Sequence, residues 1–93
     1  MVRTHPVTGR RSLFVNTQFT SHIEGLTAAE SKNLLAFLYQ HAASPNFQVR
    51  FHWEPGSVAF WDNRCTQHFI CGDANEPVRR HMQRVAIIGD KPY

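Results

Sequence analysis

Long apolar runs, closely spaced cysteine pairs and a secretion signal are all missing from this 93-residue sequence. No apolar stretch approaches the roughly 20 residues that a helix needs to cross a bilayer, so we expect no membrane partner. The N-terminal residues lack the apolar core of a signal peptide, which predicts a cytoplasmic location. Cys65 and Cys71 are the only cysteines and do not form a C-x-x-C pair. Their spacing argues against a disulfide scaffold and against a zinc ribbon.

A strong excess of charge of one sign is also missing. Ten Lys and Arg residues against seven Asp and Glu residues give a formal net charge of +3. The basic residues are scattered, apart from the pairs Arg10-Arg11 and Arg79-Arg80, so no basic stripe suited to a phosphate backbone occurs. We therefore expect no nucleic-acid partner. Apolar residues make up 42% of the chain, which is enough for a globular core.

The clearest local signal is a helix start at residues 26–30. Thr27 can accept a hydrogen bond from the Glu30 amide while the Glu30 side chain reaches back, which is the capping-box arrangement. Apolar residues then recur at helical spacing up to His41. We predict a helix that is capped by Thr27 and ends at about Ala43.

Strand signals dominate the rest of the sequence, with turn residues between them. Alternation is clearest where Val49, Phe51 and Trp53 share one face of an extended segment. Trp53, Phe60 and Trp61 are interpreted as core residues. The predicted strands cover residues 12–16, 48–53, 58–61 and 79–88. The fold class is therefore α+β, mainly β with one helix, and residues 1–93 are treated as one structural unit.

Four or five strands with a single helix leave an open sheet whose unpaired edges proteins usually avoid. A double-sheet jelly roll removes much of that exposure but takes about eight strands. A chain of this size buries only about 60–65% of its unfolded surface, so it has little stability to spare. The economical interpretation is that the chain forms the C-terminal half of a jelly roll.

Residues 61–68 and 77–84 carry the chemistry. Arg80 and Arg84 share one face of the last predicted strand, roughly 13 Å apart, because their separation is even. Guanidinium groups on an inward face need anions, and the planar fork of arginine suits a carboxylate or a sulfonate. His68, at the end of the preceding strand, could supply a metal-ligand nitrogen to the same cavity. The region therefore predicts one metal ligand and two anion clamps.

Short motifs in a fixed order make the sequence recognisable: His5-Pro6-Val7-Thr8-Gly9, Leu13-Phe14-Val15-Asn16, Phe47-Gln48-Val49-Arg50, Trp61-Asp62-Asn63-Arg64, Thr66-Gln67-His68, Arg79-Arg80 and Gly89-Asp90-Lys91-Pro92. Together they resemble the C-terminal part of the taurine dioxygenase family, the Fe(II)- and 2-oxoglutarate-dependent dioxygenases built on a double-stranded β-helix (jelly roll). The resemblance covers nearly the whole chain. It implies oxidative decarboxylation of 2-oxoglutarate with O₂, coupled to hydroxylation of a small anionic substrate. The candidate substrate is a sulfonate such as taurine, although a sulfate ester or a carboxylate also suits an arginine.

The resemblance also implies roles for individual residues. His68 matches the distal iron-binding histidine, and Arg80 matches the arginine that pairs with the far carboxylate of 2-oxoglutarate. Arg84 matches the arginine that holds the substrate sulfonate, and Phe19 falls where a phenylalanine lies against the substrate. Asp62 and Asn63 are expected to shape the turn that aims His68 inward.

The family's iron site is a facial triad of two histidines and one carboxylate, of which two ligands come from an H-x-D/E motif far upstream of His68. The strings His22-Ile23-Glu24 and His52-Trp53-Glu54 do not lie at the matching position, and we interpret them as coincidences. Residues 1–93 are therefore expected to be a C-terminal part without its N-terminal half, and to bind iron poorly alone. His5, His41 and His81 are interpreted as surface or helix-face residues without chemistry.

Two alternatives stay open at this point. The chain is either a truncated, catalytically inactive remnant of such an enzyme, or a small interaction module. A module would pair its open sheet edges with a partner, which could be the missing N-terminal half or a second copy in a homo-oligomer.

Overall fold

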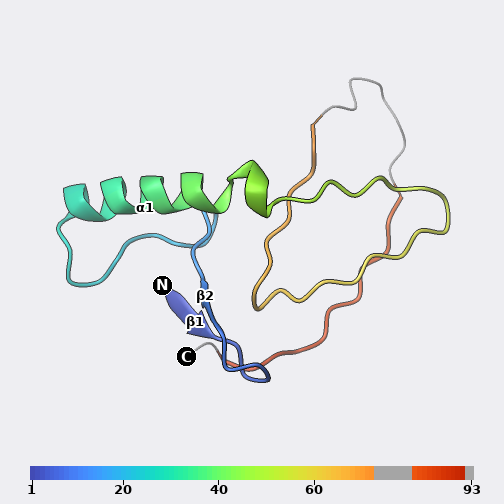
Figure 1. Cartoon of the computed structure of the whole chain (residues 1–93), viewed down its shortest axis with the longest axis horizontal. Coiled ribbons are helices and arrows are strands. Elements are labelled where there is room, and N and C mark those ends of the chain that lie inside the picture. Colours follow the sequence, from blue (N-terminus) through green and yellow to red (C-terminus); the bar gives the residue numbers. More distant parts are fainter. Residues whose placement is uncertain (73–80, 92–93) are drawn as a thin grey trace.

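The computed structural model describes residues 1–72 and 81–91. In chain order, its elements are strand β1 (Val2–Thr4), strand β2 (Arg11–Leu13), helix α1 (Ala28–Ala42) and the 3₁₀ helix η1 (Pro45–Phe47). The described part of the chain is thus a small α+β arrangement. Figure 1 shows α1 on one side of the hairpin, with a long extended segment leaving the far end of the helix.

Strands β1 and β2 form an antiparallel hairpin in which Val2 faces Leu13 and Thr4 faces Arg11. The amide of His5 donates to the carbonyl of Arg10 and closes the connecting loop, at an N···O distance of 2.8 Å. Gly9 adopts a φ of 67°, a left-handed conformation that glycine reaches without steric cost. The predicted strand over residues 12–16 is therefore shorter than expected and begins one residue earlier.

Helix α1 confirms the capping-box prediction. The Glu30 amide donates to Thr27 Oγ1 at 3.4 Å, and the Thr27 amide donates to Glu30 Oε2 at 2.9 Å. The side-chain bond of Thr27 holds the pKa of the Glu30 carboxyl below its usual value. The helix ends at Ala42, one residue before the predicted end. No helix among residues 1–72 and 81–91 is long and apolar enough to cross a membrane.

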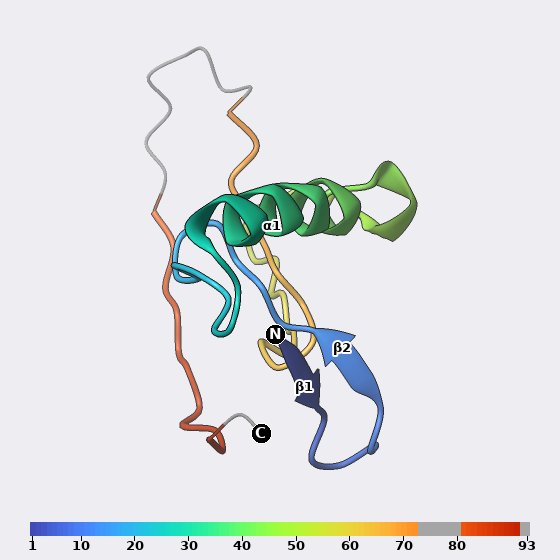
Figure 2. The same ribbon diagram turned by 90° about the vertical axis from the view of Figure 1, so that its left-hand side faces the viewer.

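The core lies where α1 covers the segment that follows β2, as Figure 2 shows from the side. Within the described residues its buried apolar members are Val15 and Leu35. Three polar residues, Arg3, His5 and Ser31, are buried as well. Ser31 and Leu35 lie four positions apart, so they share one face of α1.

The predicted strands after α1 do not form within the described residues. Residues 48–72 and 81–91 are extended or turning backbone without ladder partners, and residues 79–80 of the last predicted strand lie outside the described part. Figure 1 shows residues 48–72 as a long loop beyond the end of α1. A strand needs a neighbour about 4.8 Å away, which the alternating pattern cannot supply by itself. The half jelly roll therefore stays a prediction.

The core assignments in this region were wrong for the same reason. The side chain of Phe60 is 92% exposed, and Trp53 and Trp61 are also exposed. An apolar side chain on a strand is buried only when a second layer covers its face, and none of the described residues does so here. The alternating apolar residues thus indicated one apolar face of a strand, but they did not identify the second layer that would bury it.

Candidate functional site

Residues 62–66 form a tight turn that Asp62 holds through its own backbone and side chain. The Asp62 carbonyl accepts from the Thr66 amide at 3.0 Å and from the Thr66 hydroxyl at 2.6 Å. Its carboxylate oxygen Oδ1 accepts from the Arg64 amide at 2.8 Å. The prediction that Asp62 shapes this turn is confirmed.

The same carboxylate is the meeting point of two basic side chains. Asp62 Oδ2 accepts from Arg64 Nη2 at 2.6 Å and lies 3.1 Å from His5 Nε2. The bond from Arg64, followed by the bond from His5, holds the pKa of the Asp62 carboxyl far below its usual value. Asp62 is therefore a charged acceptor that joins the turn to the hairpin loop.

His5 was interpreted from the sequence as a surface or helix-face residue without chemistry, and its placement at the surface was wrong. Its side chain is buried, and its Nδ1 accepts from the amides of Val7 and Thr8, each at 3.2 Å. Because Nδ1 is an acceptor, the ring proton sits on Nε2, which donates to Asp62. The signal was present in the motif, since a polar acceptor placed before a Pro-containing turn can bind the amides that follow it.

A second ion pair fastens the C-terminal part of the chain to the hairpin. Arg3 Nη2 donates to Asp90 Oδ2 at 3.0 Å, and Arg64 Nη1 lies 3.9 Å from Asp90 Oδ1. The bond from Arg3 lowers the pKa of the Asp90 carboxyl. Because Arg64 contacts both Asp62 and Asp90, the network joins β1, the turn at residues 62–66 and residue 90.

Three potential metal ligands also meet in this network. Donor atoms of His5, Asp62 and Cys65 lie within 4.8 Å of one another, and no other such group occurs in the described ranges. A cation there would have to remove the Nε2 proton of His5 or break both amide bonds to Nδ1. It would also lie beside the Arg64 guanidinium. We interpret the cluster as a structural network.

His68 is arranged differently. Its side chain is exposed, and neither ring nitrogen makes a hydrogen bond to any residue in the described part of the chain. The imidazole lies against the indole of Trp61, with ring centroids 4.8 Å apart and planes tilted by 52°. A ring nitrogen without a competing partner can bind a metal, so His68 fits one ligand position of a metal site. Among residues 1–72 and 81–91, His68 belongs to no group of three or more His, Cys, Asp or Glu donors that could hold a metal.

The segment that carries His68 is anchored to the segment after β2. Gln67 Nε2 donates to the carbonyl of Val15 at 2.5 Å, and Val15 is buried. The neighbour of His68 is thus tied to the small core, although His68 itself faces solvent. The expectation that the turn aims His68 inward is not met within the described residues.

The other expected site residues are not gathered around His68. Arg80 lies outside the described residues. Phe19 is 81% exposed, and Arg84 is exposed as well. No hydrogen bond, ion pair or ring contact joins either of them to His68 in the described ranges. In the described ranges, neither H-x-E string belongs to a group of three or more potential metal ligands.

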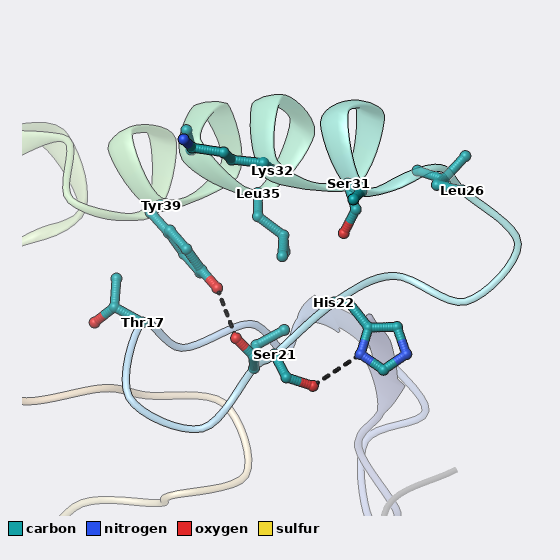
Figure 3. Close-up of a pocket in the computed structure, with 11 residues that line it drawn as sticks. Thr17, Ser21, His22, Leu26, Ser31, Lys32, Leu35 and Tyr39 are labelled. Atoms are coloured by element: carbon teal, nitrogen blue, oxygen red, sulfur yellow. Dashed lines mark hydrogen bonds between the residues drawn. The ribbon is translucent and has the colours of Figure 1, made fainter.

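A groove of about 630 Å³ runs between α1 and residues 17–26 and is shown in Figure 3. Leu35 points into it from the helix. Tyr39 donates through its hydroxyl to the Thr20 carbonyl at 3.3 Å, and Ser31 Oγ accepts from the Ile23 amide at 2.9 Å. These bonds hold the segment against the helix, so the groove is a packing feature separate from His68.

Comparison with known proteins identifies a family match over residues 1–86, to the taurine catabolism dioxygenase TauD, TfdA family. An alpha-ketoglutarate-dependent sulfonate dioxygenase of Saccharomyces cerevisiae is 42% identical over 93 residues, which are 99% of this chain and 23% of that protein. An alpha-ketoglutarate-dependent sulfate ester dioxygenase of Pseudomonas putida is 40% identical over 93 residues, 99% of this chain and 30% of that protein.

A third relative, an alpha-ketoglutarate-dependent 2,4-dichlorophenoxyacetate dioxygenase of a Burkholderia species, is 46% identical over 89 residues, 96% of this chain and 29% of that protein. The chain thus spans between 23% and 30% of the length of these three relatives. No solved structure matches it.

Proposed function

Because the chain belongs to the taurine catabolism dioxygenase TauD, TfdA family, we propose that it is the C-terminal part of an Fe(II)- and 2-oxoglutarate-dependent dioxygenase. The proposed reaction couples oxidative decarboxylation of 2-oxoglutarate to hydroxylation of a small anion. The family match over residues 1–86 is the observation that carries the proposal. The alternative of an inactive remnant differs in activity alone, which the experiment below measures.

The substrate class is proposed from what the relatives share. Their names specify a sulfonate, a sulfate ester and 2,4-dichlorophenoxyacetate, and the last is a carboxylate. All three are anions, and each presents oxygens that a planar guanidinium binds in pairs. We propose a small sulfonate, such as taurine, as the substrate, since a sulfonate is what the yeast relative is named for.

His68 is the proposed iron ligand of this chain. Two features support this role: its imidazole is exposed, and both ring nitrogens are without hydrogen bonds in the described residues. When bound, the iron supplies the O₂ chemistry. The remaining two ligands of a facial triad would come from the three-quarters of a relative's length that this chain does not cover.

Three described arginines differ in their partners, since two make ion pairs with carboxylates and one does not. Arg3 and Arg64 are engaged with Asp90 and Asp62, so they hold the fold together. Arg84 is exposed and makes no ion pair with any described residue, which leaves its guanidinium available for the substrate anion. Arg80 is proposed to pair with the far carboxylate of 2-oxoglutarate. The exposed ring of Phe19 is proposed as an apolar wall beside the substrate.

The test grafts residues 1–93 onto the yeast relative, in place of the 93 residues to which they align. Succinate formation is measured with Fe(II), 2-oxoglutarate, O₂ and a panel of sulfonates, sulfate esters and carboxylates. We expect turnover that His68→Ala abolishes, while His22→Ala, an exposed histidine outside the proposed site, retains it.

A second part of the test uses arginine variants to distinguish a loss of substrate binding from a loss of folding. Arg84→Ala is expected to raise KM for the anion at least tenfold, because a charge-assisted pair contributes about 1.5–3 kcal/mol. The exposed Arg11→Ala is its control, and its KM should stay unchanged. A folded chimera without turnover would favour the inactive remnant. Turnover that survives His68→Ala would contradict the proposed ligand.

Exposed extended segments favour one second candidate, an interaction module. Val49 and Phe60 are almost fully exposed on backbone that has no strand partner in the described residues. Such edges can pair with a second copy. Sedimentation of the 93-residue chain is the test. A dimer that Val49→Lys dissociates would support the module, and a monomer at all accessible concentrations would contradict it.

A further inference from the structure

The contact between Trp61 and His68 is the observation that extends this proposal. Their ring centroids are 4.8 Å apart, although the two residues lie on opposite sides of the turn at residues 62–66. Both side chains are exposed, and the indole is 40% exposed. Both rings thus remain in part accessible to solvent, so the pair lies at the surface of the described structure.

The indole is itself held in place. Trp61 Nε1 donates to Asn63 Oδ1 at 2.9 Å, and this bond fixes the plane of the ring. Asn63 stands in the turn that Asp62 closes and that His5 and Arg64 tie to the rest of the fold. On the other side of the turn, the Gln67 side chain is bound to the Val15 carbonyl. The two ends of the turn are thus anchored independently.

A histidine that binds a metal needs its ring orientation fixed. Proteins usually achieve this with an acceptor for the second ring nitrogen, such as a carboxylate or a backbone carbonyl. Among the described residues no such acceptor meets either nitrogen of His68. In the described part of the chain, the imidazole makes one ring contact, with the indole of Trp61.

We propose that Trp61 is the positioning residue for His68, with Asn63 holding the indole in the orientation that this requires. The inference rests on the proposed role of His68 as an iron ligand. Trp61 restricts the ring to one orientation, so less rotational freedom is lost when a nitrogen binds the metal. Hydrogen-bonded outer partners change metal affinity by about 10–100-fold when they are removed, and we expect the ring contact of Trp61 to act at the lower end of that range.

The chain offers a matched control for this residue. Trp53 has nearly the same exposure as Trp61, 42% against 40%, and its indole also makes one ring contact. That contact is to Phe51, at 4.9 Å, and does not involve a histidine. Trp61→Leu and Trp53→Leu therefore remove the same side chain from similar surroundings, and only the first affects His68.

The experiment follows the histidine ring protons of residues 1–93, isotope-labelled within the chimera with the yeast relative, by NMR while Co(II), an air-stable substitute for Fe(II), is added. In the unmetallated chain, the ring-current shift of the His68 protons should disappear in Trp61→Leu and persist in Trp53→Leu. The Co(II) dissociation constant measured at His68 should rise about tenfold in Trp61→Leu. Trp61→Phe, which keeps an aromatic face, should restore most of the affinity. Protons of His22 and His41 serve as internal references in every sample.

Asn63→Ala covers the case in which Trp61→Leu does not fold, since Asn63 is exposed and its removal leaves the indole present but unrestrained. We expect this variant to weaken Co(II) binding at His68 about threefold. Unchanged His68 shifts and affinity in Trp61→Leu would overturn the positioning role while leaving the ligand assignment intact. A chimera without substitutions that shows no Co(II) effect at His68 would instead contradict the ligand assignment, and the positioning role with it.

Discussion

Replacing His5 by alanine removes three hydrogen bonds at once. The imidazole accepts from the amides of Val7 and Thr8 and donates to Asp62. A hydrogen bond of this kind contributes about 1 kcal/mol net, and the two amides are left without their side-chain acceptor. We therefore expect His5→Ala to lower the free energy of unfolding by about 3 kcal/mol. Against a total of roughly 5–15 kcal/mol for an ordinary domain, this is a large loss.

The assay is urea unfolding of the 93-residue chain, followed by tryptophan fluorescence, because Trp61 adjoins the turn. His5→Asn should fall between wild type and alanine, since a short amide oxygen can still accept from the following backbone amides but does not reach Asp62. His52→Ala is the control, because His52 is exposed and makes no hydrogen bond, ion pair or ring contact with any described residue. A loss in His5→Ala of less than about 0.5 kcal/mol, the range of ordinary surface changes, would refute the reasoning.

Three further predictions concern the ion pairs, the helix cap and the hairpin loop that stabilise the fold. The pKa values of Asp62 and Asp90 are lowered in the folded chain, so the stability they contribute is present above the unfolded value of about 3.8 and lost as pH falls below it. Urea midpoints measured from pH 6 to pH 2 should therefore fall most steeply below pH 4, and less so in Asp62→Asn. Thr27→Ala should destabilise α1 by about 1 kcal/mol, seen as reduced helical circular dichroism on heating, whereas Thr27→Ser should not. Gly9→Ala should cost about 1–2 kcal/mol in urea unfolding because its φ of 67° is left-handed, and equal stability would contradict that loop geometry.

The features that could be predicted from the sequence are local ones. The capping box depends on residues three positions apart, so Thr27 and Glu30 alone were enough to place the start of α1. The turn at Asp62 was also anticipated, because its bonds reach only two to four residues along the chain. In each case the side chain and its partner lie within one window of the sequence.

The features that could not be predicted depend on distant partners. His5 meets Asp62 across 57 positions, and Arg3 meets Asp90 across 87, so no spacing in the sequence indicated either pair. The alternating segment that includes Val49 predicted a strand, which does not form within the described residues. A strand there would need a neighbouring strand, which the described residues do not supply. The alternation of apolar and polar residues along one segment does not indicate which other segment pairs with it.

The candidate site also contains one feature that the sequence indicated and one that it did not. The exposure of His68 and the absence of hydrogen bonds at its ring nitrogens in the described residues agree with a ligand role, which the motif alone implied. Its contact with Trp61 was missed, because Trp61 was interpreted as a core residue. The indole is amphipathic, with an apolar face and one polar N–H, and both parts are used at the surface here.

The most direct test of the central claim is an anaerobic titration of the chimera with Fe(II) and 2-oxoglutarate, recorded as the visible absorption of the chelated complex. We predict an absorption band with residues 1–93 in place, and its loss in both His68→Ala and Arg80→Ala. The isolated 93-residue chain, with one proposed ligand, should show no band. A band that persists at full strength in His68→Ala would contradict the claim that this chain supplies an iron ligand.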